Sequence, residues 1–202
     1  REICERLAAG EPISSMTDIA GTCVLVSEKP LDCLECPSYE RVSVPDAVGK
    51  RAYAEATRMQ YEQQDAFAGK TIVQRHGTRY VKQNPPAEPV GGAELDAVYA
   101  LPYMRTYHPS YEAAGGVPAI QEVEHSITHN RGCFGGCNFC AIAFHQGRYV
   151  TSRSEKSVLD EAVKITQGKN FKGYIHDVGG PTANFRRSAC DKKSLCTNRK
   201  CL

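Results

Sequence analysis

The chain reads RGCFGGCNFC over residues 131–140, and this stretch brings Cys133, Cys137 and Cys140 within eight positions of one another. An iron–sulfur cubane has four irons, and proteins usually bind it through four cysteine thiolates. A loop with three thiolates binds three irons and leaves the fourth one open. The interspersed glycines permit positive φ angles and a close approach of the backbone, which wrapping a cluster demands. The spacing therefore predicts that these three cysteines bind a [4Fe–4S] cluster.

An open iron widens the chemistry that such a cluster supports. It can chelate the amino and carboxylate groups of S-adenosylmethionine, and one electron from the reduced cluster then breaks the sulfonium S–C5′ bond. The 5′-deoxyadenosyl radical that remains abstracts hydrogen from an unactivated C–H bond, while the protein holds the geometry and excludes side reactions. The loop therefore predicts S-adenosylmethionine as a second cofactor.

Other interpretations of the three cysteines stay open. A structural zinc site needs four ligands, and His129 or His145 could supply the fourth. A disulfide with one free thiol is a further alternative, which the lack of a secretory signal disfavours. A non-catalytic iron–sulfur or zinc-binding module is thus the alternative to a radical enzyme.

Regular structure is expected around the cysteine loop. Residues 122–128 alternate apolar and polar side chains, as a strand does. Ser154 can cap a helix that runs to about Gln167, and residues 171–178 follow as a second strand. Strand, loop, helix and strand form a βαβ unit, so the pattern predicts a parallel pair of strands.

The first half of the chain predicts further α and β elements. Residues 1–9 carry apolar side chains at helical spacing, and residues 22–27 form an apolar run typical of a strand buried on both faces. Residues 31–45 are expected to be a loop, in which Cys33 and Cys36 are ordinary thiols.

The middle of the chain predicts a helix, a hairpin and a connector. Residues 46–68 are rich in helix-forming residues and start with Pro45-Asp46. Residues 71–82 suit a hairpin that turns at Gly77. Residues 83–119 hold six prolines, which predicts an extended connector with one short helix near residues 94–99.

Composition excludes several classes of partner. The 25 basic and 23 acidic residues give a net charge of +2, which offers no electrostatic footprint for nucleic acid or an anionic membrane. No apolar stretch is long enough to span a bilayer, and no signal peptide is recognisable. The protein is therefore expected to be cytoplasmic, where clustered cysteines more often bind metal than form disulfides.

Several motifs resemble those of the YgiQ-type radical SAM proteins, an uncharacterised family. The resemblance covers most of the chain and is carried by Tyr107-His108-Pro109, Gly115-Gly116-Val117-Pro118-Ala119-Ile120, Arg131-Gly132-Cys133-Phe134-Gly135, Phe144-His145-Gln146-Gly147-Arg148, Tyr174-Ile175-His176-Asp177-Val178-Gly179-Gly180-Pro181-Thr182-Ala183-Asn184, Gln74-Arg75-His76-Gly77 and Gln83-Asn84-Pro85-Pro86.

The resemblance implies an α/β fold in three parts. Residues 1–45 would be the end of a Rossmann-like N-terminal region, and residues 46–119 a helical and extended connector. Residues 120–202 would be the truncated start of a radical SAM partial (β/α) barrel, opening with its first βαβ unit. The substrate of the family is unknown, and an electron donor such as flavodoxin or ferredoxin is expected.

The resemblance also implies roles for single residues. The three cysteines match the cluster ligands, and Phe139 matches the aromatic position whose backbone usually contacts adenine. Gly179 and Gly180 match the place where a Gly-Gly-Glu motif commonly binds the methionine amino group. Pro181 stands where glutamate is usual, so its side chain offers no carboxylate for that contact.

Polar residues near the loop are further candidates. His145, Gln146 and Arg148 could orient substrate or S-adenosylmethionine, or could simply cap a helix or face solvent. His176 and Asp177 are expected on the second strand, near the mouth of the barrel where such active sites form.

A second group of cysteines lies near the end of the chain. Cys190, Cys196 and Cys201 could bind an auxiliary cluster, or they could belong to a loop whose partners lie further downstream.

Only 22 residues follow Gly180, fewer than the roughly 30 that another βαβ unit requires. We expect an internal fragment of a longer enzyme, able to bind a cluster and inactive by itself.

Overall fold

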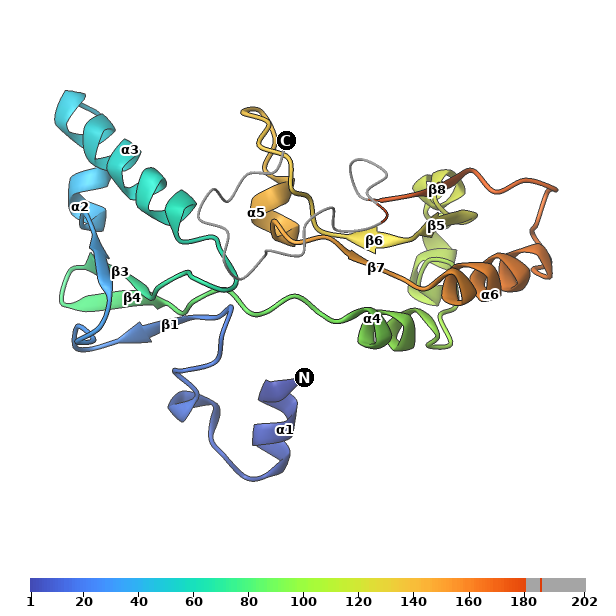
Figure 1. Cartoon of the computed structure of the whole chain (residues 1–202), viewed down its shortest axis with the longest axis horizontal. Helices are drawn as coiled ribbons and strands as arrows, with labels where there is room; N and C mark the ends of the chain where they lie inside the picture. The colour runs from blue at the N-terminus through green and yellow to red at the C-terminus, as the bar shows by residue number, and fades with distance from the viewer. Residues whose placement is uncertain (181–185, 187–202) are drawn as a thin grey trace. The chain divides into compact units, whose positions relative to one another are not determined.

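The computed structural model describes residues 1–180 and Arg186, and Figure 1 labels its helices and strands. The chain divides into two compact units, residues 1–88 and residues 89–202. Both units contain helices and strands, which confirms the expected α/β class as a mixed α/β fold. Within the described residues, no helix combines the length and the apolar character that crossing a membrane requires.

A four-stranded sheet organises the first unit (Figure 1). Its strands are β1 (Cys23–Val26), β2 (Leu34–Cys36), β3 (Ile72–His76) and β4 (Arg79–Gln83), in the order β1-β4-β3-β2. β4 pairs antiparallel with both β1 and β3, whereas β2 pairs parallel with β3. The predicted hairpin is confirmed, and Gly77 turns it with a φ of +59° that glycine adopts without strain.

The expectation that the apolar run of β1 is buried on both faces is wrong. The strand alternates instead: Val24 is half-buried, while Leu25 is 61% exposed. Among the described strands, β1 pairs with β4 only, at the edge of the sheet, and one of its two faces is left uncovered. Only alternate side chains of such a strand are covered.

The segment expected as a loop at residues 31–45 contains β2 and a short helix, α2 (Tyr39–Val42). Ser38 caps this helix by accepting a hydrogen bond from a backbone N–H in its first turn. β2 is only three residues long and forms because Leu34 lies opposite Ile72 of β3. A pairing so distant along the chain leaves no local pattern in the sequence.

The predicted helix in the middle of the first unit is confirmed as α3 (Ala47–Glu62). The Asp46 carboxylate caps it by accepting two backbone N–H groups, each at 2.8 Å. The helix stops short of residue 68, because Asp65 accepts hydrogen bonds from two backbone N–H groups just after it. This local turn competes with continuation of the helix. The unit also contains α1 (Glu2–Ala8) and the 3-10 helix η1 (Ile13–Ser15).

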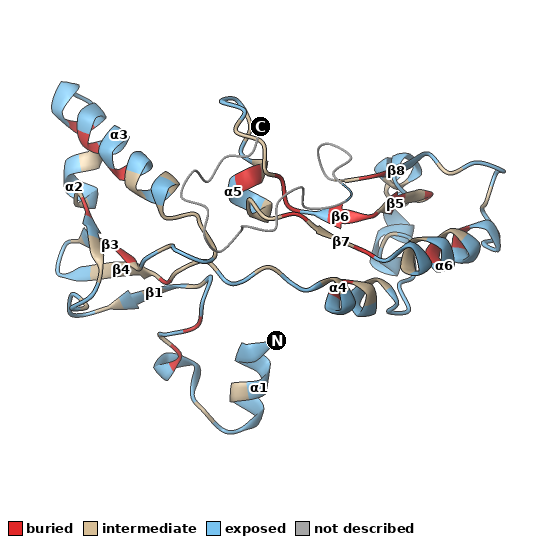
Figure 2. Cartoon of the chain, viewed as in Figure 1, coloured by how far each residue is buried: buried red, intermediate tan, exposed pale blue. Residues whose placement is uncertain are grey.

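The core of the first unit lies where α3 packs on the sheet, and Figure 2 shows buried positions along α3 and β3. Cys36, Ala56 and Ile72 form a buried cluster, against which Val42 and Met59 pack. Burial raises the pKa of the Cys36 thiol above its ordinary value, so the thiol stays protonated and behaves as a small apolar side chain. The structure therefore agrees with an ordinary thiol at this position.

The substitution Gly49→Ala is expected to destabilise the protein, although alanine normally favours a helix by about 1 kcal/mol over glycine. A Cβ at Gly49 would lie 1.8 Å from the carbonyl oxygen of Val44. We expect the free energy of unfolding to fall by about 1–3 kcal/mol, measured by chemical denaturation. The neighbouring exposed change Lys50→Ala is the control, and a stability gain in Gly49→Ala would contradict this packing.

The second unit has shorter helices and strands, and turns and loops make up much of it. In chain order they are α4 (Gly92–Tyr99), η2 (Pro109–Ala114), η3 (Pro118–Glu122), β5 (Ser126–Thr128), β6 (Asn130–Arg131), α5 (Ile142–Gln146), β7 (Thr151–Ser152), α6 (Glu155–Thr166) and β8 (Asp177–Gly179). α4 confirms the short helix expected within the connector.

The predicted βαβ pattern is confirmed in β5, α6 and β8, because β5 and β8 pair parallel and α6 lies between them in the chain. The Ser154 hydroxyl caps α6 by accepting the backbone N–H of Ser157 at 3.1 Å. Both strands are shorter than expected. The first loses its start because η3 ends at Glu122 and residues 123–125 form a turn, in which the N–H of Ser126 donates to the carbonyl oxygen of Val123.

The finer assignments of the fold stay predictions. These are the Rossmann-like end, the partial barrel, and the division of the chain near residues 45 and 119. β2 lies before residue 45 and β3 lies after it, and the two strands pair within one sheet.

Candidate functional site

The cysteine loop is closed at its base by two short strands. β6 and β7 pair antiparallel, with Arg131 opposite Thr151. One step further along, the backbone N–H of Cys133 donates to the carbonyl oxygen of Gly147 at 3.0 Å. The loop therefore leaves and re-enters the second unit through one narrow hydrogen-bonded neck.

Gly132 makes this neck possible. Its φ is +86°, and a Cβ at this position would lie 1.9 Å from the carbonyl oxygen of Tyr149. Both facts exclude any side chain, so the glycine directly before the first cysteine is a requirement of backbone packing. The N–H of Gly132 also points to Oε1 of Gln146, at 3.5 Å. Gln146 thus contacts the loop itself.

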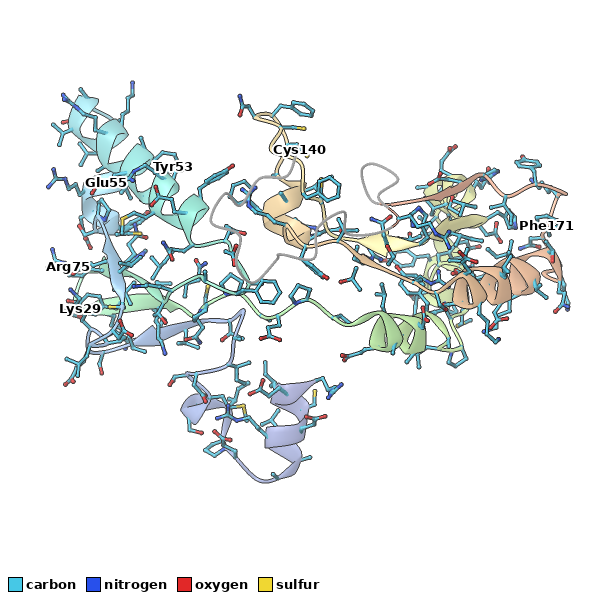
Figure 3. The ribbon with its side chains drawn as sticks, in the orientation of Figure 1. Lys29, Tyr53, Glu55, Arg75, Cys140 and Phe171 are labelled. Atoms are coloured by element: carbon cyan, nitrogen blue, oxygen red, sulfur yellow. The ribbon has the colours of Figure 1, made fainter. Side chains whose placement is uncertain are left out.

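The three cysteines of the loop are free thiols that differ in exposure. Cys133 is buried, Cys140 is half-buried and Cys137 is exposed. The backbone N–H of Cys140 donates to the carbonyl oxygen of Cys137 at 3.1 Å, which folds this end of the loop into a turn. Figure 3 labels Cys140 on the loop.

Gly135 lies between two of the thiols. A Cβ placed on it would lie 3.3 Å from Sγ of Cys133 and 3.8 Å from Sγ of Cys137, so both sulfurs approach one open point. The donor chemistry fits an iron–sulfur cluster, since free thiols line a space that a side chain would fill. In residues 1–180 and 186, no three Cys, His, Asp or Glu side chains converge as a complete metal site.

A buried arginine anchors β5, the strand that precedes the neck of the cysteine loop. The Arg153 side chain is 1% exposed and forms an ion pair with Glu161 of α6. Its guanidinium also donates to the carbonyl oxygen of Thr128, at the end of β5, at 2.9 Å and to both the hydroxyl and the carbonyl oxygen of Ser157. Burying this charge is tolerable because its hydrogen-bonding groups have partners.

Two residues from the segment before η2 also contact this ion pair. The ring of Tyr99, the last residue of α4, lies under Arg153 with the guanidinium carbon 4.1 Å from its centroid. The Tyr99 hydroxyl accepts a hydrogen bond from Arg131 at 2.7 Å, and Arg105 pairs with Glu161 at 2.5 Å. None of these residues was singled out from the sequence, because their contacts exist only in the folded chain.

The connector also reaches the start of α6 through Asp96. Its carboxylate accepts the backbone N–H of Ser154 at 3.0 Å. Burial acts to raise the pKa of Asp96, but the hydrogen bonds from Ser154 and Ser157 outweigh it and hold that pKa below its ordinary value.

The two glycines expected to bind cofactor lie next to the base of the loop. Gly179 is buried, and its carbonyl oxygen accepts the N–H of His129 at 2.9 Å. Gly180 follows and is half-buried. Phe139 is 93% exposed within the loop, which leaves its ring without cover from the described residues. Their roles stay predictions.

His176 and Asp177 lie away from the loop, which corrects their expected position. His176 precedes β8, and its N–H donates to the carbonyl oxygen of His125, just before β5. Asp177 is the first residue of β8 and pairs with Ser126, the first residue of β5. The cysteine loop follows the opposite ends of these strands.

The roles of the other candidates stay predictions. Arg148 lies over the ring of Phe144, with 5.6 Å from its guanidinium carbon to the ring centroid. His145 is in the last turn of α5. Cys190, Cys196 and Cys201, the candidate ligands of an auxiliary cluster, lie outside the described residues.

Comparison with known proteins identifies the class. The family model described as Radical SAM N-terminal matches residues 1–126, so the chain belongs to this radical SAM family. Its curated relatives carry the name UPF0313 protein. The relative from Clostridium botulinum strain Okra is 51% identical over 208 residues, and that from Clostridium perfringens strain 13 is 47% identical over 207 residues. The resemblance to YgiQ-type radical SAM proteins is thereby confirmed.

These matches cover 100% of this chain and 31% of the length of each of these two relatives. No solved structure matches the chain.

The substitution Gly135→Ala is expected to lower the iron content of the anaerobically reconstituted protein. Gly135 does not have a positive φ, so alanine adds only a methyl group, 3.3 Å from Sγ of Cys133. We expect the affinity for iron, measured by competition with an iron chelator, to fall roughly tenfold or more. The unfolding midpoint should stay nearly unchanged. Gly91→Ala, at a position with open space, is the control. Full iron binding by Gly135→Ala would contradict the proximity of the two thiols.

Proposed function

We propose that this chain carries the cluster-binding loop of a radical S-adenosylmethionine enzyme. The observation that supports it most is the approach of the Cys133 and Cys137 sulfurs to one open point beside Gly135. Membership of the radical SAM N-terminal family supports it independently. The whole protein's reaction and substrate belong to the same proposal and stay unspecified.

Three thiolates hold the cluster in this proposal, namely those of Cys133, Cys137 and Cys140. When bound, the cluster and S-adenosylmethionine together supply a 5′-deoxyadenosyl radical for hydrogen abstraction. The chain's own contribution is to hold the ligands in a loop whose neck is fixed by Gly132 and by the pairing of β6 with β7.

Residues beside the loop would bind S-adenosylmethionine. Gly179 and Gly180 lie next to the loop's base, where backbone groups can approach a ligand closely because no Cβ intervenes. Phe139 is exposed in the loop and would contact the adenine through its backbone. Pro181 offers no carboxylate for the methionine amino group, which leaves this contact to the iron and to backbone groups.

The partners follow from the chemistry. Reduction of the cluster requires an electron donor, for which a flavodoxin or a ferredoxin is proposed. A cytoplasmic location suits the seven free cysteines among the described residues, since thiols persist in a reducing compartment.

Alanine at Cys133, Cys137 and Cys140 together is expected to abolish iron binding. The wild-type protein, reconstituted anaerobically, should bind about four irons per chain and turn brown, because the cubane has four irons. Alanine at Cys4, Cys23 and Cys33 is the matched control, since it removes three thiols from the first unit. Iron content and colour unchanged from the wild-type level in the first variant would refute the cluster assignment.

Adding S-adenosylmethionine is expected to change the electron paramagnetic resonance spectrum of the reduced cluster, because the open iron gains ligands from the cofactor. The measurement separates the proposal from the alternative of a non-catalytic module. An unchanged spectrum would indicate a cluster for electron transfer, and a colourless protein with one tightly bound zinc would indicate a structural site.

A further inference from the structure

Asn130 is the most deeply buried polar residue near the cysteine loop. Its exposure is 0%, and neither Oδ1 nor Nδ2 of its carboxamide has a hydrogen-bond partner among the described residues. A carboxamide has two N–H donors and one carbonyl acceptor. Asn130 therefore presents a complete set of hydrogen-bonding groups that the described protein leaves unused.

Such an arrangement is costly. A buried polar group without a partner costs about 1–3 kcal/mol, because it loses its bonds to water and gains nothing in return. Native proteins pair the great majority of these groups, and each exception calls for an explanation, often a bound water, ion or functional role. The unpartnered amide lies directly before the loop. Leucine has a similar volume and would fill the same position without an unpaired polar group.

Two further unpartnered polar atoms accompany Asn130. They are Nδ1 of His129, which is 7% exposed, and Oγ1 of Thr151. His129 precedes Asn130 in the chain, and Thr151 lies on β7, the partner strand of β6. All of these atoms therefore belong to the neck of the cysteine loop.

Asn84, in the first unit, shows what a structural asparagine looks like in this protein. It is 3% exposed, and its Nδ2 donates to the carbonyl oxygens of Thr17 and Ile19 and to the hydroxyl of Thr22, at 3.0 to 3.2 Å. Asn84 thus pins a loop to a strand. Asn130 is as deeply buried but does nothing comparable, so its role differs.

We propose that Asn130 is a cofactor-binding residue whose Nδ2–H groups donate to an acceptor on the bound cluster or on its S-adenosylmethionine. This inference rests on the proposed function. Asn130 lies three positions before Cys133, which limits the distance between their Cα atoms to about 11 Å. An N–H group that donates to a cluster sulfur stabilises the reduced state, and one that donates to a carboxylate strengthens cofactor binding.

The proposal makes the effect of one substitution depend on whether the cofactor is bound. Asn130→Leu removes an unpartnered amide from the cluster-free protein, so the unfolding midpoint should stay equal or rise. In the cluster-loaded protein the same change removes a hydrogen bond to the cofactor. We therefore expect roughly tenfold or greater loss of iron affinity against a ferrous chelator, or of S-adenosylmethionine affinity.

Asn84→Leu is the matched control. It breaks three hydrogen bonds of a buried asparagine in the first unit, so it should lower the unfolding midpoint equally in the cluster-free and cluster-loaded protein. Asn130→Ala tests the same proposal without added bulk, should leucine prevent folding. Both Asn130 variants should shift the cluster's reduction potential to more negative values if the acceptor is a cluster sulfur.

The outcomes separate the two possible acceptors from a purely structural role. A shifted potential without S-adenosylmethionine assigns the acceptor to the cluster, and weaker S-adenosylmethionine binding at an unchanged potential assigns it to that cofactor. If the Asn130 variants lower stability in both states and leave iron affinity, potential and S-adenosylmethionine binding unchanged, the proposal is overturned. Failure of the proposed function itself is recognised separately, because the wild-type protein then binds no cluster.

Discussion

The contact between Gly132 and the carbonyl oxygen of Tyr149 is the constraint on which the loop geometry depends. A Cβ at Gly132 would lie 1.9 Å from that oxygen, so the two chain segments approach as closely as backbones can. This approach closes the loop at its neck and fixes the backbone position of Cys133. The backbone of Cys133, the first ligand of the proposed cluster, is therefore held by close packing at the preceding position, where only glycine fits.

Behind this neck, a buried ion pair joins elements that are distant in the sequence. Arg153 contacts the end of β5, α6 and the ring of Tyr99, while Arg105 shares its partner Glu161. Tyr99 and Arg105 lie within the matched family region 1–126, whereas Arg153 and Glu161 follow it. Residues of the family's N-terminal region thus help to support the cysteine loop. Their contacts with Arg153 and Glu161 cross the point at which the matched region ends.

The two buried asparagines illustrate how one side chain serves stability or function according to its partners. Asn84 uses its amide to tie the chain together, and the cost of burial is offset within the protein. Asn130 is fully buried beside the proposed cofactor site with its amide unused by the described residues. In the proposal, this carboxamide donates to the bound cofactor, and its burial strengthens that hydrogen bond because the local dielectric is low.

Local sequence determined those features whose physics is local. The cysteine spacing, the caps at Asp46 and Ser154, the hairpin at Gly77 and the βαβ order are each encoded within a few residues, so they could be predicted. Tertiary structure alone decided the pairing of β2 with β3, the edge position of β1 and the contacts of Arg153 and Asn130. Hydrogen bonds between distant segments, and the burial that their packing produces, exist only once the chain has folded. No local sequence pattern therefore predicts them.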